Sequence, residues 1–438
     1  MNWLGLNPDD VDSAAWTILV GICCSVPCAI LGCYLILRRM SLLGDAISHA
    51  VLPGIAVAFL LSGQLSAWPV FLGAMALGVL TAFLTHTLHS FGNVPEDASM
   101  GVVFTSLFAV GVILITHAAA DVDLDPGCVL YGLIEFVPLD TVTLLGREVP
   151  RALQTMVPML VATVLFVLLL WKELKLVSFD PMLATAMGIN ATLVHYLLMA
   201  MVACVTVASF EAVGSIVVVA MLIVPAATAH LLTDRLGWMM AWATAVAVLS
   251  AIVGYAGAVL WNTSVAGMMA VAAGLQFLLA VVLAPRHGVL SKVVHNLALS
   301  LRIASEDLIG MLYRAEEAGD RALGVRGVGW HRCLEALGGG LAARFALLQL
   351  RRQGQIEFAP GRQVLLTEEG RRRAHSLVRS HRLWEVYLGQ HFQLPPDHLH
   401  EPASRIEHYL GAGLQEQLDA DLDRPILDPH GRAIPPAG

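Results

Sequence analysis

The sequence predicts an all-α polytopic membrane protein of about nine transmembrane helices, followed by a mainly α-helical soluble part. Two observations lead to this prediction. First, 57% of the 438 residues are hydrophobic, only 14% are charged, and the mean hydropathy is +0.71, all outside the range of soluble proteins. Second, residues 1–290 hold 8 of the 26 lysines and arginines, and residues 291–438 hold the other 18. The first two-thirds therefore belongs in a membrane and the last third in water.

Nine apolar runs are long enough to cross the roughly 30 Å hydrocarbon core, which takes about 17–25 helical residues. They are 15–37, 43–62, 67–86, 98–118, 154–171, 190–209, 211–232, 238–260 and 265–284. The sixth and seventh runs are poorly separated, because only Ser209, Phe210 and Glu211 lie between them. An even number of spans would change the side on which the chain ends.

Basic residues orient these spans. With the N-terminus outside, the inner connections hold Arg38, Arg39, Lys172, Lys175, Arg235 and Arg286, whereas the outer ones hold only Arg147 and Arg151. Cytoplasmic loops of membrane proteins carry an excess of lysine and arginine. The bias of six to two therefore predicts a multi-pass protein surrounded by membrane lipid, with its C-terminal domain in the cytoplasm.

Asp45 and His49 lie one helical turn apart at the start of the second span. An ionisable side chain in hydrocarbon costs about 2.5–3.5 kcal/mol on insertion scales and usually marks a function. Residues i and i+4 share a helix face, and a carboxylate with an imidazole suits a divalent transition metal. The pair predicts a metal path through the membrane; the competing interpretation is a helix cap beside an interfacial imidazole. Glu211, at the predicted outer start of span seven, is either interfacial or a second contributor to this path.

Residues 173–189, ELKLVSFDPMLATAMGI, predict a short cytoplasmic helix between spans five and six. Asp180 can cap its start, Pro181 suits its first turn, Ala184 lies inside it, and Gly188 can end it. Such a helix is either a plain connector or an element that docks into another protein.

Four segments in this order resemble the permease subunit of the zinc, manganese and iron-uptake ABC transporter family: RRMSLLGDAISHAVLPGIA, NVPEDASMGVVFTSLFAVGV, SFDPMLATAMGI and FEAVGSIVVVAMLIVPAATAHLLTDRL. The resemblance covers roughly residues 15–285. It implies a dimeric importer permease in the bacterial cytoplasmic membrane, paired with an identical or related second permease. It further implies a cytoplasmic ATPase partner and a periplasmic or lipid-anchored metal-binding protein.

The same resemblance assigns roles to two sets of residues. Asp45 and His49 match the intramembrane metal ligands of that family, and residues 173–189 match its coupling helix, which docks in the ATPase. The chain has no GxxxxGK[ST] segment to cradle ATP phosphates, so we expect no bound nucleotide and no catalytic activity of its own.

After Pro285 the pattern changes to a linker at 291–303 and then to amphipathic helices at 304–318, 330–336 and 341–353. The segment GQIEFAPGRQVLLTEEG predicts two strands joined by a turn at Pro360 and Gly361, and residues 367–390 predict a long helix. Three helices followed by a hairpin indicate a winged-helix domain over 304–366. A separate α-helical part over 367–438 follows this domain, and residues 1–290 form the transmembrane domain.

Residues 304–435 resemble metal-dependent repressors of the diphtheria-toxin-repressor and manganese-regulator type. The segments LTEEGRRRAHSLVRSHRLWEVYL, HEPASRIEH and DPHGRAIP carry this resemblance. It implies a metal-binding and dimerisation role for 367–438, with ligands at Asp307, His381, Glu385, His400, Glu407 and His408. Ser404 stands where that family has a Cys or Glu ligand, and Gly310 where manganese regulators have a Glu. The domain is therefore either a metal sensor with one weakened site or a structural module with vestigial histidines.

The spacing of these residues supports the ligand assignment. His381 and Glu385 are four residues apart and share a helix face. His400 and Glu407 are two turns apart, again on one face, with His408 beside them. Histidine combined with carboxylates suits manganese, iron or zinc.

The sequence disfavours DNA binding. The helix that would read bases begins GGGLAARF, in which only Arg344 could reach a base edge. Other arginines could contact phosphate, but solvated faces or contacts with a transporter ATPase explain them equally well. They are Arg351, Arg352, Arg371, Arg372 and Arg373.

These features together predict the permease subunit of an ABC importer for manganese, zinc or iron, with a cytoplasmic domain that senses metal. The metal is the substrate and also a candidate ligand of the C-terminal domain. His49 must be neutral to coordinate, so uptake should weaken at acidic pH. The alternative from another class is a membrane-tethered metal-dependent transcriptional regulator, but nine spans exceed what an anchor needs.

Overall fold

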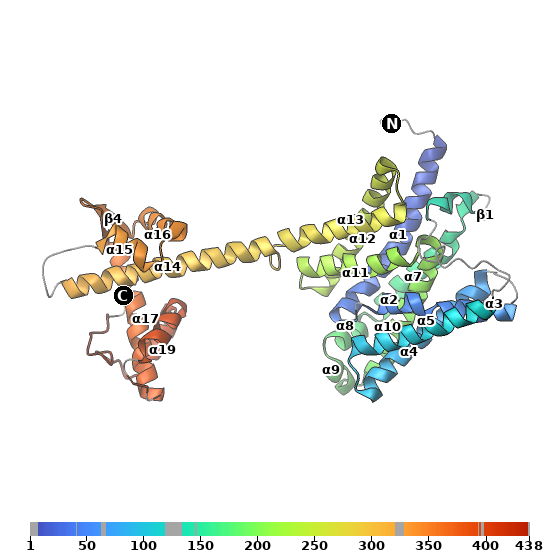
Figure 1. The fold of residues 1–438 in the computed structure, drawn as a ribbon. Helices are drawn as coiled ribbons and strands as arrows, with labels where there is room; N and C mark the ends of the chain where they lie inside the picture. The colour runs from blue at the N-terminus through green and yellow to red at the C-terminus, as the bar shows by residue number, and fades with distance from the viewer. Residues whose placement is uncertain are drawn as a thin grey trace. The chain divides into compact units, whose positions relative to one another are not determined.

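The computed structural model of the chain describes residues 8–40, 42–62, 67–118, 134–144, 147–319, 328–392, 394–395 and 398–436. The chain divides into two compact units, Met1–Ser291 and Lys292–Gly438 (Figure 1). The boundary lies one residue from the end of the predicted transmembrane domain.

The first unit is a bundle of apolar helices. In the described part of the chain, nine helical segments between Asp12 and Leu283 are long and apolar enough to cross a membrane, and they coincide with the nine predicted spans. Their helices are α1 (Pro8–Leu37), α2 (Leu43–Ala50), α3 (Leu52–Ser62), α4 (Ala67–Gly92), α5 (Glu96–Ala118), α7 (Ala152–Leu169), α10 (Ala191–Val213), α11 (Ser215–Leu232), α12 (Leu236–Trp261) and α13 (Val265–Leu283).

The second span is not one continuous helix. Helices α2 and α3 meet at Val51, two residues before Pro53. Proline has no backbone N–H, so the carbonyl of His49 cannot receive the usual helical hydrogen bond from position 53. The interruption therefore lies directly after the predicted metal ligands Asp45 and His49.

The sixth and seventh spans separate at Gly214 rather than at residues 209–211. Gly214 has a φ of +79°, a conformation that side chains disfavour, and it ends α10 and precedes α11. Glu211 consequently belongs to the last turn of α10, and its predicted place at the start of the seventh span is wrong. Apolar periodicity could not find this boundary, because both sides of it are equally apolar.

Helix α1 lies at the centre of the bundle, against α11 and α12. At the crossing with α11, a Cβ on Gly32 would lie 1.8 Å from the carbonyl oxygen of Leu222. The two backbones thus approach more closely than any side chain allows, as small residues permit between membrane helices.

Short elements connect the spans. Helices α8 (Trp171–Phe179) and α9 (Pro181–Ala186) lie between α7 and α10, where the sequence predicts one short helix. A 3₁₀ turn η1 (Ile134–Leu139) and an antiparallel hairpin of β1 (Thr141–Leu144) and β2 (Arg147–Pro150) precede α7. This hairpin is absent from the all-α prediction, because its strands are only four residues long.

Helix α14 (Val289–Gly319) begins at the end of the first unit and continues into the second. The predicted linker 291–303 is therefore helical. After residue 327 come β3 (Val328–Gly329), α15 (Trp330–Ala336), α16 (Gly340–Arg352), β4 (Ile356–Ala359) and β5 (Gln363–Leu366). The strands form an antiparallel sheet in the order β3-β5-β4, and the β4–β5 turn contains Pro360 and Gly361 as expected.

The remainder of the second unit is α17 (Glu368–Phe392), α18 (His400–Ile406), η3 (Glu407–Tyr409) and α19 (Ala412–Asp421), followed by an extended tail. Its apolar residues form two clusters. One joins α14 to the sheet through Leu308, Leu312 and Val364, and the other joins α17 to α19 through Leu383 and Leu418. Helix α17 contributes to both, so it fixes α14, α18 and the tail around its middle turns.

Candidate metal centres

Asp45 and His49 form a pair on α2. The Nε2 atom of His49 lies 3.6 Å from Oδ1 of Asp45, and the two side chains are 39% and 48% exposed, respectively. The imidazole packs against Phe104 and Phe108 of α5, with both ring centroids 5.9 Å away. Two aromatic rings therefore restrict the imidazole while its carboxylate neighbour remains accessible.

The third predicted residue of this path, Glu211, is on a different helix. Its backbone lies near the end of α10, and its side chain is outside the described residues. The geometry of the path consequently rests on Asp45 and His49 alone.

Both ends of helix α9 are formed by the residues that the sequence predicts. The Asp180 carboxylate accepts a hydrogen bond from the backbone N–H of Leu183 at 2.9 Å, Pro181 begins the helix, and Gly188 follows its end with a φ of +83°. Ala184 is fully buried, whereas Met182 and Met187 are exposed. A short, rigidly capped helix thus presents large apolar side chains to its surroundings.

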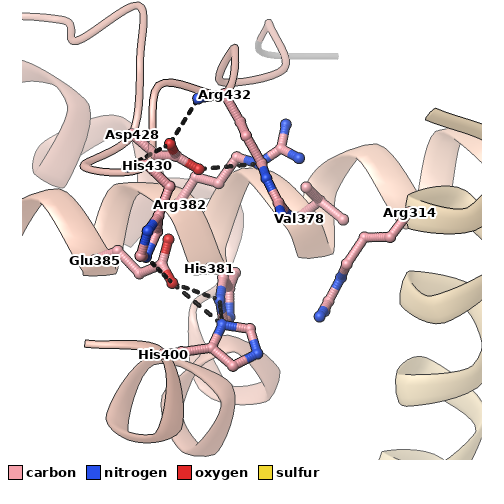
Figure 2. Close-up of a pocket in the computed structure, with 9 residues that line it drawn as sticks. All are labelled: Arg314, Val378, His381, Arg382, Glu385, His400, Asp428, His430 and Arg432. Carbon is pink, nitrogen blue, oxygen red and sulfur yellow. Dashed lines mark hydrogen bonds and ion pairs between the residues drawn. The ribbon is translucent and has the colours of Figure 1, made fainter. Parts of the chain in front are cut away.

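In the second unit, His381, Glu385 and His400 form what we call the first metal cluster (Figure 2). Helix α17 places His381 and Glu385 one turn apart, and α18 begins at His400. The His381 Nε2 atom lies 3.0 Å from Glu385 Oε1 and 2.8 Å from His400 Nδ1. His381 and Glu385 are almost completely buried, whereas the His400 side chain is 58% exposed, so the cluster opens toward solvent.

The C-terminal tail closes one side of this cluster. Asp428 Oδ1 accepts hydrogen bonds from the backbone N–H groups of His430 and Arg432, and this turn brings His430 Nε2 to 3.8 Å from Glu385 Oε1. Arg382 holds the tail by donating to the carbonyl of Ala433. A cavity of about 350 Å³ remains between these residues, with Arg314 on its far side (Figure 2). His430 is within the quoted DPHGRAIP segment, but its approach to a glutamate 45 positions earlier has no local sequence signal.

Asp307, Glu407 and His408 form the second metal cluster. The two residues after α18 supply Glu407 and His408, and α14 supplies Asp307. His408 Nε2 lies 3.3 Å from Asp307 Oδ1 and 4.0 Å from Glu407 Oε1. All six predicted ligands of the second unit thus converge, but in two groups of three. His400 and Glu407, predicted to share a face, both contact His381 on different ring nitrogens and belong to different clusters.

In both clusters, the neighbouring groups favour protonated histidines beside ionised carboxylates. Burial alone would lower the pKa of His381, but the carboxylates of Glu385 and Glu407 outweigh burial, so the pKa is raised. Burial likewise opposes ionisation of Glu385, yet the neighbouring His381 and His400 keep its pKa below the usual value. In the second cluster, Asp307 and Glu306 raise the pKa of His408 to about 9. A metal ion would replace these protons.

Glu407 supplies a structural test of metal fit. Its side chain is buried. Oε2 lies against His381 Nδ1, whereas Oε1 has only Arg314 at 3.9 Å and His408 at 4.0 Å nearby among the described residues. Burying a charged carboxylate oxygen such as Oε1 without a close hydrogen-bond donor costs several kcal/mol. A divalent cation between Asp307, Glu407 and His408 would remove this cost, and the imidazole–carboxylate donors suit manganese, iron or zinc.

The two positions that depart from the repressor pattern supply no ligand. Gly310 has no side chain, and the Ser404 hydroxyl donates to the backbone carbonyl of His400 at 2.8 Å. Among the described residues, each cluster therefore has three ligand side chains, with His430 near the first and Glu306 near the second.

Three of the arginines that could contact phosphate form ion pairs within the second unit. Arg371 contacts Glu316 and Glu368, Arg372 contacts Glu369, and Arg373 contacts Glu306. Arg344 is exposed on α16 beside the exposed Phe345. Arginines that already neutralise carboxylates within the domain have less charge to offer to DNA phosphates.

Comparisons with known proteins agree with these two units. Residues 10–284 match the ABC 3 transport family, and residues 367–436 match the metal binding and dimerisation domain of iron dependent repressors. The chain is 47% identical to the manganese transport system membrane protein MntD of Bacillus subtilis over 284 residues, covering 65% of this chain and 96% of MntD. It is 40% identical to the zinc transport system membrane protein TroD of Treponema pallidum over 284 residues, covering 65% of this chain and 77% of TroD.

A solved structure gives the same result for the membrane unit. PsaBC from Streptococcus pneumoniae, determined in complex with a Fab, superposes with a TM-score of 0.52 at 32% sequence identity. The match covers 62% of this chain and 92% of the PsaBC chain, so it includes nearly the whole of that protein chain but only part of this one.

Proposed function

Because the chain belongs to the ABC 3 transport family, we propose that it is the permease subunit of an importer that carries a divalent transition metal ion across the bacterial cytoplasmic membrane. The ion is manganese, zinc or iron, and relatives named for manganese and zinc transport match this chain over 284 residues. The observation that carries the proposal is the Asp45–His49 pair, which offers two metal ligands where the second span is interrupted.

The pair is an incomplete coordination sphere. Transition metals in proteins take four to six ligands, whereas one chain offers a carboxylate and an imidazole on side chains that are roughly 40–50% exposed. A second permease subunit, identical or related, would cover this face and supply further ligands. Asp45 contributes charge attraction, and His49 contributes a neutral nitrogen that loses its ligand capacity on protonation.

Energy comes from a partner. The helix α9 is suited to dock an ATPase, because its Asp180 cap makes it rigid and its exposed Met182 and Met187 offer apolar contact. We therefore propose that α9 is the coupling helix. A periplasmic or lipid-anchored metal-binding protein would deliver the ion to the outer side of the membrane unit.

We further propose that the second unit senses cytoplasmic metal and reduces transport when metal is abundant. Its two clusters offer histidine and carboxylate ligands, and Oε1 of the buried Glu407 has no close hydrogen-bond donor among the described residues. Helix α14 supports the regulatory role, because it starts at Val289 in the membrane unit and carries Asp307 of the second cluster. A metal ion bound by Asp307 would restrain the helix that follows the last span, after the five residues 284–288.

The alternative is a membrane-tethered transcriptional regulator built on a winged-helix domain over 304–366. The pairing of Arg371, Arg372 and Arg373 with glutamates argues against it. A gel-shift measurement on the full chain in nanodiscs, with and without manganese, tests this alternative, and metal-dependent retention of DNA would revive it.

Uptake in cells tests the main proposal. Cells expressing the chain with its ATPase and binding protein would be compared with cells expressing Asp45→Ala, a full-length His381→Ala/His408→Ala variant, or a truncation after residue 290. Each is measured after low and high metal preload. We expect Asp45→Ala to abolish uptake, and the other two variants to transport normally but to escape inhibition at high preload. Normal uptake by Asp45→Ala would refute the intramembrane site, and unchanged inhibition in the other variants would refute the sensor.

A further inference from the structure

Glu306 is a buried carboxylate beside the second metal cluster that none of the preceding assignments uses. It precedes Asp307 on α14, and its Oε2 atom lies 2.9 Å from Nδ1 of His408. Its other oxygen, Oε1, accepts from Arg373 of α17 at 2.8 Å and from Arg302 at 3.2 Å. Glu306 is therefore held by two arginines while its second oxygen faces the imidazole.

The two nitrogens of His408 consequently have different surroundings. Nδ1 faces Glu306, whereas Nε2 faces the cluster ligands Asp307 and Glu407 at 3.3 and 4.0 Å. A metal ion coordinated by Asp307 and Glu407 can reach only the Nε2 lone pair. Neutral imidazole carries one N–H proton, so Nδ1 must hold that proton and donate a hydrogen bond to Glu306.

We propose that Glu306 is the positioning residue of the second metal cluster, because it fixes His408 in the tautomer whose Nε2 atom binds a divalent transition metal. The inference rests on the proposed sensor function and adds a residue to that site. A carboxylate that accepts the far N–H of a metal-bound histidine orients the ring and makes the ligating nitrogen more basic. Asp307 and Glu306 thus act on opposite edges of one imidazole, from adjacent positions on α14.

The arginines make this positioning rigid. Glu306 is 6% exposed, and Arg302 and Arg373 anchor its Oε1 from α14 and α17. Arg302 also donates to the backbone carbonyl of His408 at 3.5 Å, so it holds both partners of the contact. The imidazole therefore cannot turn its Nδ1 atom toward Asp307 and Glu407 without breaking the buried ion pair with Glu306.

Cobalt binding to the full chain in nanodiscs tests the proposal with each cluster isolated in turn. A His400→Ala background reports the second cluster, and a His408→Ala background reports the first. Glu306→Gln is introduced into both, and calorimetry gives the affinity while visible absorption gives the coordination geometry of Co²⁺. Glu316→Gln is the matched control, because Glu316 is also an α14 glutamate paired with an α17 arginine but touches neither cluster.

We expect Glu306→Gln to weaken cobalt binding by about 10–100-fold and to change the absorption spectrum in the His400→Ala background only. Glu316→Gln should match its parent in both backgrounds. An unchanged affinity and spectrum in the Glu306→Gln variant would overturn the positioning role while leaving the sensor intact. Equal losses at both clusters would also overturn it, since they would indicate a general structural defect. Absence of binding at either cluster before Glu306 is changed would overturn the sensor proposal itself.

Discussion

His381 Nδ1 lies 2.5 Å from Glu407 Oε2, and this contact joins the two metal clusters. The opposite nitrogen of His381 faces Glu385 and His400, while the other oxygen of Glu407 faces His408. A metal ion on His381 Nε2 requires the ring proton on Nδ1, where it points at Glu407. Glu407 is therefore a ligand in one cluster and an orienting group for the other.

The shared contact predicts that Glu407→Gln lowers metal affinity at both clusters. The second cluster loses a charged ligand, and the first loses the carboxylate that orients His381, a loss worth about 10–100-fold. Asp307→Asn is the control, because Asp307 touches His408 but has no contact with the first cluster among the described residues. Calorimetry in the His408→Ala background checks the first cluster. Normal affinity there in Glu407→Gln would show that the clusters bind independently.

Uptake should depend on the charge of Asp45. Asp45→Asn keeps the size of the side chain and its place beside His49, but it removes the anionic ligand. We expect the initial rate of manganese or zinc uptake to fall by at least about 100-fold, since even outer-shell partners of a metal cost 10–100-fold. Asp97→Asn, which changes an exposed carboxylate in the first turn of α5, should transport at the normal rate. Radioisotope uptake distinguishes the two, and similar rates would remove Asp45 from the path.

The N-terminal cap of α9, Asp180, should be needed for coupling ATP hydrolysis to transport. Asp180→Ala removes the acceptor of the Leu183 N–H, which costs about 1 kcal/mol of helix stability. Because α9 is the proposed docking element, we expect uptake to fall several-fold while ATP hydrolysis by the partner becomes less dependent on metal. Asp180→Asn retains an acceptor at the same position and should restore both quantities. Paired assays of uptake and hydrolysis in proteoliposomes test this, and a defect common to both substitutions would point to the charge instead of the cap.

The stability of the metal-free second unit should depend on pH through His408 and Glu306. The pKa of His408 is raised from 6.5 to about 9, so its stabilising contribution is complete below pH 6.5 and is lost as the pH rises through 9. Burial opposes ionisation of Glu306, but His408, Arg373 and Arg302 lower its pKa from 4.5 to about 2. Its contribution is present above pH 4.5 and is lost as the pH falls through 2.

Melting of the full chain in nanodiscs with a chelator checks this dependence. We expect the transition of the second unit to move to lower temperature between pH 6.5 and 9, and His408→Gln to flatten that region of the curve. His331→Gln changes a histidine outside both clusters and should leave the curve unchanged. A wild-type transition that is constant over this range would show that the His408 ion pairs contribute little.

Much of the architecture followed from local patterns. Apolar length found nine spans, and the residue types at positions 180, 181 and 188 fixed the ends of α9, because capping depends on neighbours within a few residues. The boundary near Gly214 was missed, since it depends on a single backbone conformation between two equally apolar runs. The predicted linker at 291–303 became helix, because its residues have no breaker and continue the α14 pattern.

The sequence by itself determined which residue types are available: an aspartate and a histidine one turn apart in a span, and six ligands in the second unit. It could not determine how those six divide. Glu306 and His408 are 102 positions apart, and His430 reaches Glu385 only through a tail folded around Asp428. Periodicity encodes which face of a helix is buried, whereas the partner of that face is set by packing between distant segments. Tertiary structure alone therefore decided that His381 joins the two clusters and that Glu306 faces the far nitrogen of His408.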